Sequence, residues 1–85
     1  MLDVREDDEF AGGHIPGATH MYVGYLEERL KELSLDKDRP VVVTCGVGHR
    51  AGLGVSILLR AGFTDVRNLL GGMKAWHGLE LPVEP

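Results

Sequence analysis

Four consecutive β-branched residues at 41–44 lead directly into Cys45, the only cysteine of the chain. A short apolar run of this kind is typical of a strand that is covered on both faces. Two glycines and an arginine follow within five positions, and an apolar stretch of helical length begins after them. This order predicts a strand, a tight turn and a helix, with the thiol at the turn.

Segments of strand character and of helix character alternate along the rest of the chain. Strands are expected at 2–4, 19–23, 41–44 and 66–69, and helices at 7–11, 25–33, 51–61 and 71–78. This alternation favours an α/β domain with a mainly parallel sheet flanked by helices. The helix at 51–61 is apolar on almost every side, so we expect it to be heavily buried, with Gly62 ending it.

Length and charge limit the organisation of the chain and its partners. A sequence of 85 residues suits one small domain, and we expect it to span 1–85. The net charge is −4 without a basic run, which argues against a nucleic-acid partner. No segment reads as a membrane span and the first residues do not resemble a signal peptide, so we expect a cytoplasmic location.

The residues around Cys45 suit a sulfur nucleophile. The thiolate is the reactive form of cysteine, and helix N-termini and nearby cations lower a thiol pKa from about 8.5. Gly46 and Gly48 let the backbone fold tightly, so that N–H groups form a nest for an anion. Arg50 adds a permanent charge with a planar set of donors, and His49 a further donor. A lone cysteine is also commonly an inert apolar residue, and the local pattern supports both interpretations equally.

A single cysteine excludes several kinds of chemistry. The chain has no partner for an intramolecular disulfide, no Cys-x-x-Cys pair and no resolving cysteine. A sulfur atom carried by Cys45 would therefore have to pass to an external acceptor. His20 and His77 lack a third ligand at suitable spacing, so no metal site is expected.

Other polar and aromatic residues are expected to serve the fold. Asp3 and Arg5 are predicted to form a structural salt bridge or to anchor a loop. His14 is predicted to hydrogen-bond within its own turn. Met73 and Trp76 lie three positions apart and are expected in the core.

Four short motifs cover nearly the whole chain in a fixed order. They are Asp-Val-Arg at 3–5, Glu-x-x-x-Gly-His-Ile-Pro-Gly-Ala at 9–18, Cys-x-x-Gly-x-Arg at 45–50 and Gly-Gly-x-x-x-Trp at 71–76. Each motif is modest alone, but their joint occurrence is specific. Together they resemble the motifs of the rhodanese family of sulfurtransferases, and this resemblance implies a rhodanese-like fold.

The resemblance implies a sulfurtransferase that works through a cysteine persulfide. Cys45 would take a sulfane sulfur from thiosulfate or a thiol persulfide and pass it to a thiol, to cyanide or to a partner protein. Arg50 would act with Cys45 in catalysis by orienting the leaving group of the donor. The substrate-binding residues would be those of the loop between them, Gly46, Val47, Gly48 and His49. No metal or organic cofactor is implied.

The length and composition of the loop separate related activities. Phosphatases of the same fold have five residues between the cysteine and the arginine, whereas here four intervene, and the smaller cup suits a single sulfur atom. Gly46 stands where thiosulfate-type loops often carry an arginine, which predicts weaker capture of a dianion. A thiol persulfide, for instance that of glutathione, is therefore an alternative donor.

Two alternatives concern the larger protein. Relatives usually carry a strand and a helix before the Asp-Val-Arg segment, so we expect a shortened N-terminus, in a trimmed domain or beside a neighbouring chain that covers the sheet edge. The alternative function is a non-enzymatic sulfur-carrier, sensing or docking module of a larger sulfur-metabolism protein.

Overall fold

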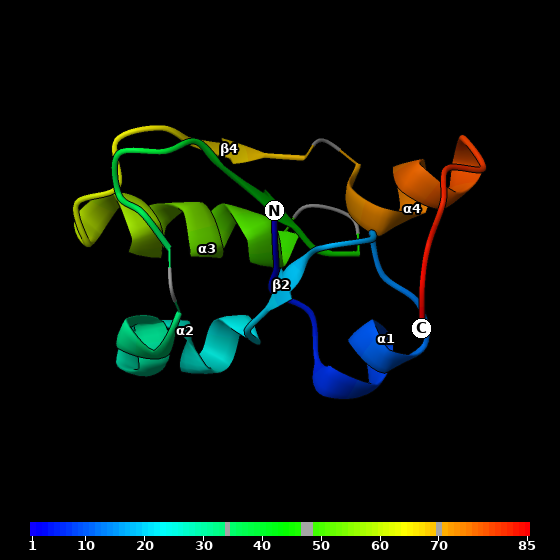
Figure 1. The fold of residues 1–85 in the computed structure, drawn as a ribbon, viewed down its shortest axis with the longest axis horizontal. Helices are drawn as coiled ribbons and strands as arrows, with labels where there is room; N and C mark the ends of the chain where they lie inside the picture. Colours follow the sequence, from blue (N-terminus) through cyan, green and yellow to red (C-terminus); the bar gives the residue numbers. More distant parts are fainter. Residues whose placement is uncertain (34, 47–48, 70) are drawn as a thin grey trace.

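Helices and strands alternate in the computed structural model, which describes residues 1–33, 35–46, 49–69 and 71–85 (Figure 1). In chain order the elements are β1 (Leu2–Asp3), α1 (Asp7–Ala11), β2 (Thr19–His20), α2 (Val23–Arg29), the 3-10 helix η1 (Leu30–Glu32), β3 (Val41–Thr44), α3 (His49–Arg60), β4 (Val66–Asn68) and α4 (Gly72–Gly78). This alternation confirms the predicted α/β class. Among the described residues, no helix has both the length and the apolar character that crossing a membrane requires.

The strands of the described residues form a parallel sheet in the order β2-β1-β3-β4. Leu2 pairs with Thr19 on one side and with Val43 on the other. At the far side of the sheet, Val41 pairs with Val66. Because these strands run in one direction, their carboxyl ends share one edge, and the loops that follow them meet there.

Close packing of α3 on the sheet depends on Gly54. A Cβ atom at this position would lie 3.2 Å from Val43 and 3.4 Å from Val4, both of which are buried. Leu26 of α2 and Leu58 of α3 are fully buried in the same core. A small residue at position 54 therefore lets α3 approach the sheet, and this approach fixes the start of α3 next to the end of β3.

The boundaries of β2 and α2 differ from the sequence-based expectation. The predicted strand at 19–23 is too long, because β2 ends at His20 and α2 begins at Val23. The α-helix predicted at 25–33 ends at Arg29 in the structure, where α2 is followed by the 3-10 helix η1. Val23 and Leu26 are both buried at helical spacing, so core burial outweighs the strand preference of the β-branched valine.

The prediction that α3 is heavily buried is wrong. Leu53 is 53% exposed and Leu59 is 50% exposed, whereas Ile57 and Leu58 are buried. The helix therefore has one covered face, which packs on the sheet and α2. Gly62 follows the helix with a φ of 102°, as expected for a glycine that ends a helix.

The chain continues past α4 and returns to the N-terminal part of the molecule (Figure 1). Glu84 and His14 exchange two backbone hydrogen bonds of 2.8 Å. Trp76 donates from Nε1 to the carbonyl of Pro82 at 2.8 Å, and it is half-buried under this returning segment and not in the core. Met73 is buried, as predicted.

Candidate active site

Cys45 follows β3 directly and lies at the shared carboxyl edge of the sheet. The residue is only 1% exposed. Because β1 lies between β2 and β3, the segment that follows β1 leaves the sheet next to Cys45. Water screens charges weakly at such a buried position, so groups near the sulfur act on it strongly.

The helix that follows Cys45 begins earlier than predicted. We expected a start near Ala51, but α3 begins at His49. His49 and Arg50 therefore belong to the first turn of α3, with the side chain of His49 exposed and that of Arg50 half-buried. Backbone N–H groups in the first turn of a helix lack intrahelical partners and carry partial positive charge.

Of the four predicted substrate-binding residues, the structure describes Gly46 and His49. Val47 and Gly48 lie outside the described residues. The two described residues mark the ends of the loop. Its first end is attached to β3 through Cys45, and its second end is the first residue of α3.

The guanidinium of Arg50 binds the carboxylate of Glu9, which belongs to the sequence motif at 9–18. Nη1 of Arg50 donates to Oε1 of Glu9, and Nη2 donates to Oε2 at 3.0 Å. These hydrogen bonds lower the pKa of Glu9 from 4.5 to about 2 and raise the pKa of Arg50. In the sequence, only the motif at 9–18 pointed to Glu9, and this motif did not indicate that Glu9 would pair with Arg50.

Arg50 also lies against the active loop. A Cβ atom at Gly46 would be 3.1 Å from Nη2 of Arg50. The charge of Arg50 interacts with Cys45, and this interaction contributes to raising the pKa of Arg50. The structure thus brings Cys45, Gly46 and Arg50 together, and Glu9 binds the guanidinium of Arg50.

The first turn of α4 binds the start of the loop. The N–H of Met73 donates to the carbonyl of Cys45 at 2.7 Å, and the N–H of Lys74 donates to that of Gly46 at 2.9 Å. Sequence reasoning identified the Gly-Gly-x-x-x-Trp motif but not its contact with the active loop. Cys45 and Gly46, at the start of the loop, are therefore held by α4, and Arg50 lies against Gly46.

The predicted structural role of Asp3 and Arg5 is confirmed. Arg5 Nη2 lies 2.8 Å from Asp3 Oδ2, and both side chains are buried. Nη2 of Arg5 also donates to the carbonyl of Gly13 at 2.8 Å, which ties β1 to the turn that follows α1. His14 donates from Nδ1 to the carbonyl of Phe10 at 3.0 Å, as expected for a residue that stabilises its turn.

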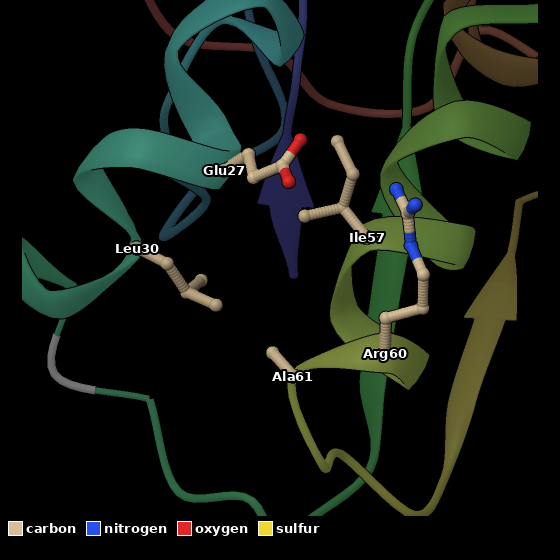
Figure 2. Close-up of a pocket in the computed structure, with 5 residues that line it drawn as sticks. All are labelled: Glu27, Leu30, Ile57, Arg60 and Ala61. Atoms are coloured by element: carbon tan, nitrogen blue, oxygen red, sulfur yellow. The ribbon is translucent and has the colours of Figure 1, made fainter.

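A cavity of about 200 Å³ is lined by Glu27 of α2, Leu30 of η1, Ile57 and Arg60 of α3, and Ala61 just after α3. Figure 2 shows Glu27 and Leu30 on one side of it and the other three residues on the opposite side. This cavity lies at the C-terminal end of α3, whereas Cys45 precedes its N-terminal end. The helix has 12 residues and a length of roughly 18 Å, so the cavity is remote from the thiol. It is therefore separate from the candidate site.

A second cavity, of about 380 Å³, lies nearer to the candidate site. It is lined by Glu6, Asp7, Asp8, Tyr22 and Tyr25. Its residues follow β1 and β2, so it opens at the same sheet edge as Cys45. Of its lining residues, Glu6 interacts electrostatically with Arg50. In the described part of the chain, this cavity included, no three His, Cys, Asp or Glu side chains are placed to hold a metal ion.

Comparison with known proteins places the chain among proteins that share this architecture. The family model for the Rhodanese-like domain matches residues 1–79. The uncharacterized protein YqhL of Bacillus subtilis is 41% identical over 78 residues, which cover 92% of this chain and 60% of YqhL. Thiosulfate sulfurtransferase GlpE of Stutzerimonas stutzeri is 34% identical over 77 residues, which cover 91% of this chain and 69% of GlpE. The chain thus spans less than two thirds of YqhL.

A solved structure agrees with these sequence relationships. The crystal structure of the Rhodanese_3-like domain of Alr3790 from Anabaena sp. is 36% identical to this chain. It superposes with a TM-score of 0.88, covering 99% of this chain and 95% of that one. The predicted rhodanese-like fold is confirmed, and this chain belongs to the rhodanese-like domain family.

Proposed function

We propose that this domain is a sulfurtransferase that carries sulfane sulfur on Cys45 as a persulfide. The observation that carries the proposal is the position of Cys45, buried at the end of β3 and within the field of the Arg50 guanidinium. A fixed positive charge near the reacting sulfur stabilises negative charge that develops during sulfur transfer. The similarity to a thiosulfate sulfurtransferase supports the same class of reaction.

In the first half-reaction, the thiolate of Cys45 attacks the outer sulfur of the donor. A sulfur–sulfur bond forms on Cys45 while the sulfur–sulfur bond of the donor breaks. The electron pair of the broken bond leaves with sulfite when the donor is thiosulfate, or with a thiolate when it is a thiol persulfide. Arg50 stabilises the negative charge on the attacking and leaving groups.

In the second half-reaction, a nucleophilic acceptor attacks the terminal sulfur of the persulfide. The new bond forms to cyanide or to a thiol, and the electron pair of the broken bond returns to Cys45 as a thiolate. Two separate transfers through one covalent intermediate predict ping-pong kinetics. This cycle requires no net oxidant or reductant.

The active loop supplies the remaining contacts in this proposal. We assign binding of the sulfur substrate to Gly46, Val47, Gly48 and His49, through backbone N–H groups directed at the anionic sulfur. The contacts of Gly46 with Arg50 and α4 support this assignment at the first end of the loop. The position of His49 in the first turn of α3 supports it at the second end.

The charges around the loop disfavour a donor such as thiosulfate, whose two negative charges are concentrated at the reacting group. The charge of Arg50 is balanced by Glu9. The neighbouring cavity adds Glu6, Asp7 and Asp8 at the same sheet edge. These carboxylates repel a dianion, so we propose a thiol persulfide as the preferred donor and a small thiol or a thiol of a protein as the acceptor.

Intact-protein mass spectrometry tests the proposal. After incubation with thiosulfate or with glutathione persulfide, we expect one added sulfur atom on the protein and none on the Cys45→Ser variant. Cyanide should then remove the sulfur as thiocyanate. Absence of an adduct with every donor would contradict the enzymatic proposal and favour a docking or sensing module. A stable adduct that cyanide and small thiols do not remove would favour a sulfur carrier that passes its sulfur only to a partner protein.

A further inference from the structure

We propose that Gly72 is a positioning residue for the active loop, a role that rests on the proposed function of Cys45. Gly72 is the first residue of α4 and is buried beneath the start of the loop. It does not touch the substrate in this proposal. It acts by allowing α4 to hold the loop in one orientation.

The space at Gly72 excludes any side chain. A Cβ atom there would lie 2.2 Å from the carbonyl oxygen of Cys45 and 2.8 Å from that of Gly46. Both neighbours are backbone atoms of the active loop, so a larger residue can be accommodated only if the loop or α4 moves. The φ of Gly72 is 53°, which independently favours glycine.

The same two carbonyls accept the hydrogen bonds that join α4 to the loop. Met73 donates to Cys45 at 2.7 Å and Lys74 donates to Gly46 at 2.9 Å. A movement that relieves a collision at position 72 must therefore lengthen both hydrogen bonds. Glycine at position 72 therefore allows α4 to bind the carbonyls of two consecutive residues, Cys45 and Gly46.

Peptide geometry connects this contact to the sulfur. In a trans peptide the C=O and N–H groups point in opposite directions, and no cis peptide occurs among the described residues. Holding the carbonyl of Cys45 against α4 therefore turns the N–H of Gly46 away from α4. We infer that this N–H faces the anionic sulfur of Cys45, where it stabilises both the thiolate and the persulfide.

Gly71 provides a matched control. Its φ is 78°, so a side chain there is also strained. A Cβ atom at Gly71 would lie 2.6 Å from the Cβ of Ala75, and its three nearest atoms all belong to Ala75. A substitution at 71 therefore strains α4 without a direct collision with the active loop.

The test compares Gly72→Ala and Gly71→Ala in the full chain. We would measure the melting temperature, the alkylation rate of Cys45 by iodoacetamide across pH, and kcat and KM for sulfur transfer. Both variants should melt at lower temperature. Only Gly72→Ala should shift the alkylation profile upward, by about one pH unit, and lower kcat by about tenfold or more with little change in KM.

Two results would overturn the proposal. One is a wild-type alkylation profile in folded Gly72→Ala. The other is an equal shift in both variants, which would assign the effect to α4 stability. Because alkylation needs no sulfur donor, a wild-type protein that accepts no sulfur would contradict the proposed function and leave this test valid.

A second pair of variants serves if Gly72→Ala does not fold. Lys74→Pro removes the N–H that binds the carbonyl of Gly46, and proline is tolerated in the first turn of a helix. Lys74→Ala retains that N–H and measures the contribution of the side chain alone. The upward shift of the alkylation profile should be larger in Lys74→Pro than in Lys74→Ala. Equal profiles would contradict the proposal.

Discussion

The carboxylate of Glu9 and the guanidinium of Arg50 are separated by 41 positions in the sequence and form a two-point ion pair. Glu9 lies on α1 and Arg50 in the first turn of α3. The pair therefore connects the segment after β1 with the helix that follows Cys45. It holds the cation next to the loop and also balances its charge.

Glu9→Gln should lower the free energy of unfolding by about 1 kcal/mol at neutral pH, the scale of a partly exposed ion pair. Because the pKa of Glu9 in the folded state is about 2, below its ordinary value of 4.5, the pair stabilises the fold above pH 4.5. Its contribution is lost as pH falls toward 2. Urea denaturation of both proteins should show a difference that shrinks in acid, and a constant difference would contradict this assignment.

Arg50→Lys should lower sulfur-transfer turnover by about tenfold, because a lysine cannot make both bonds to Glu9 while lying against Gly46. The melting temperature should change much less than turnover. Arg60→Lys, at the other end of α3, is the control and should leave turnover unchanged. Unchanged turnover in Arg50→Lys together with a large loss of thermal stability would make Arg50 a structural residue.

Arg5→Met should destabilise the fold by roughly 3–5 kcal/mol, because it leaves the carboxylate of Asp3 buried without its partner. Arg67→Met is a matched control, since Arg67 and Asp65 form an ion pair of the same sequence spacing with both side chains exposed. That variant should lose less than about 1 kcal/mol. Chemical denaturation measures both values, and similar losses would show that burial does not decide the strength of these pairs.

Leu58→Ala should cost about 2–5 kcal/mol of unfolding free energy, as is usual for truncation of a buried leucine. Leu59→Ala, one position further, should cost much less, because Leu59 is half exposed whereas Leu58 is fully buried. The same denaturation experiment compares the two. Equal losses would indicate that α3 is covered on both sides, as the sequence alone had suggested.

Replacing Asp7 and Asp8 with asparagine should lower KM for thiosulfate by about twofold, because two negative charges are removed beside the candidate site. The effect should fade at high ionic strength, since exposed charges are screened. The matched control replaces Asp36 and Asp38 with asparagine in a loop that precedes β3. An equal decrease of KM in the control would indicate a general effect of net charge.

Several features of the fold and of the candidate site could be predicted from neighbouring residues. The β-branched run at 41–44 placed Cys45 at the end of a strand, and turn chemistry placed Gly62 at the end of α3. The structural role of Asp3 and Arg5, as a salt bridge or a loop anchor, was also predicted, and the two residues are only two positions apart. In each case the signal lies within a few residues of the feature.

The remaining features depend on contacts between distant segments. The exposure of Leu53 and Leu59 depends on which neighbours cover α3, and the apolar composition of the helix does not reveal this. The partner of Glu9 depends on the order of the strands, which brings α1 next to the start of α3.

The sequence by itself determined the α/β class, the turn that carries the thiol and the family motifs, because these follow from local periodicity, turn residues and spacing. Only the tertiary structure decided how the start of the loop is held: Arg50, bound to Glu9, lies against Gly46, and the carbonyls of Cys45 and Gly46 accept hydrogen bonds from α4. The physical reason is that hydrogen bonds between distant segments form only after the sheet order and helix packing have brought them together.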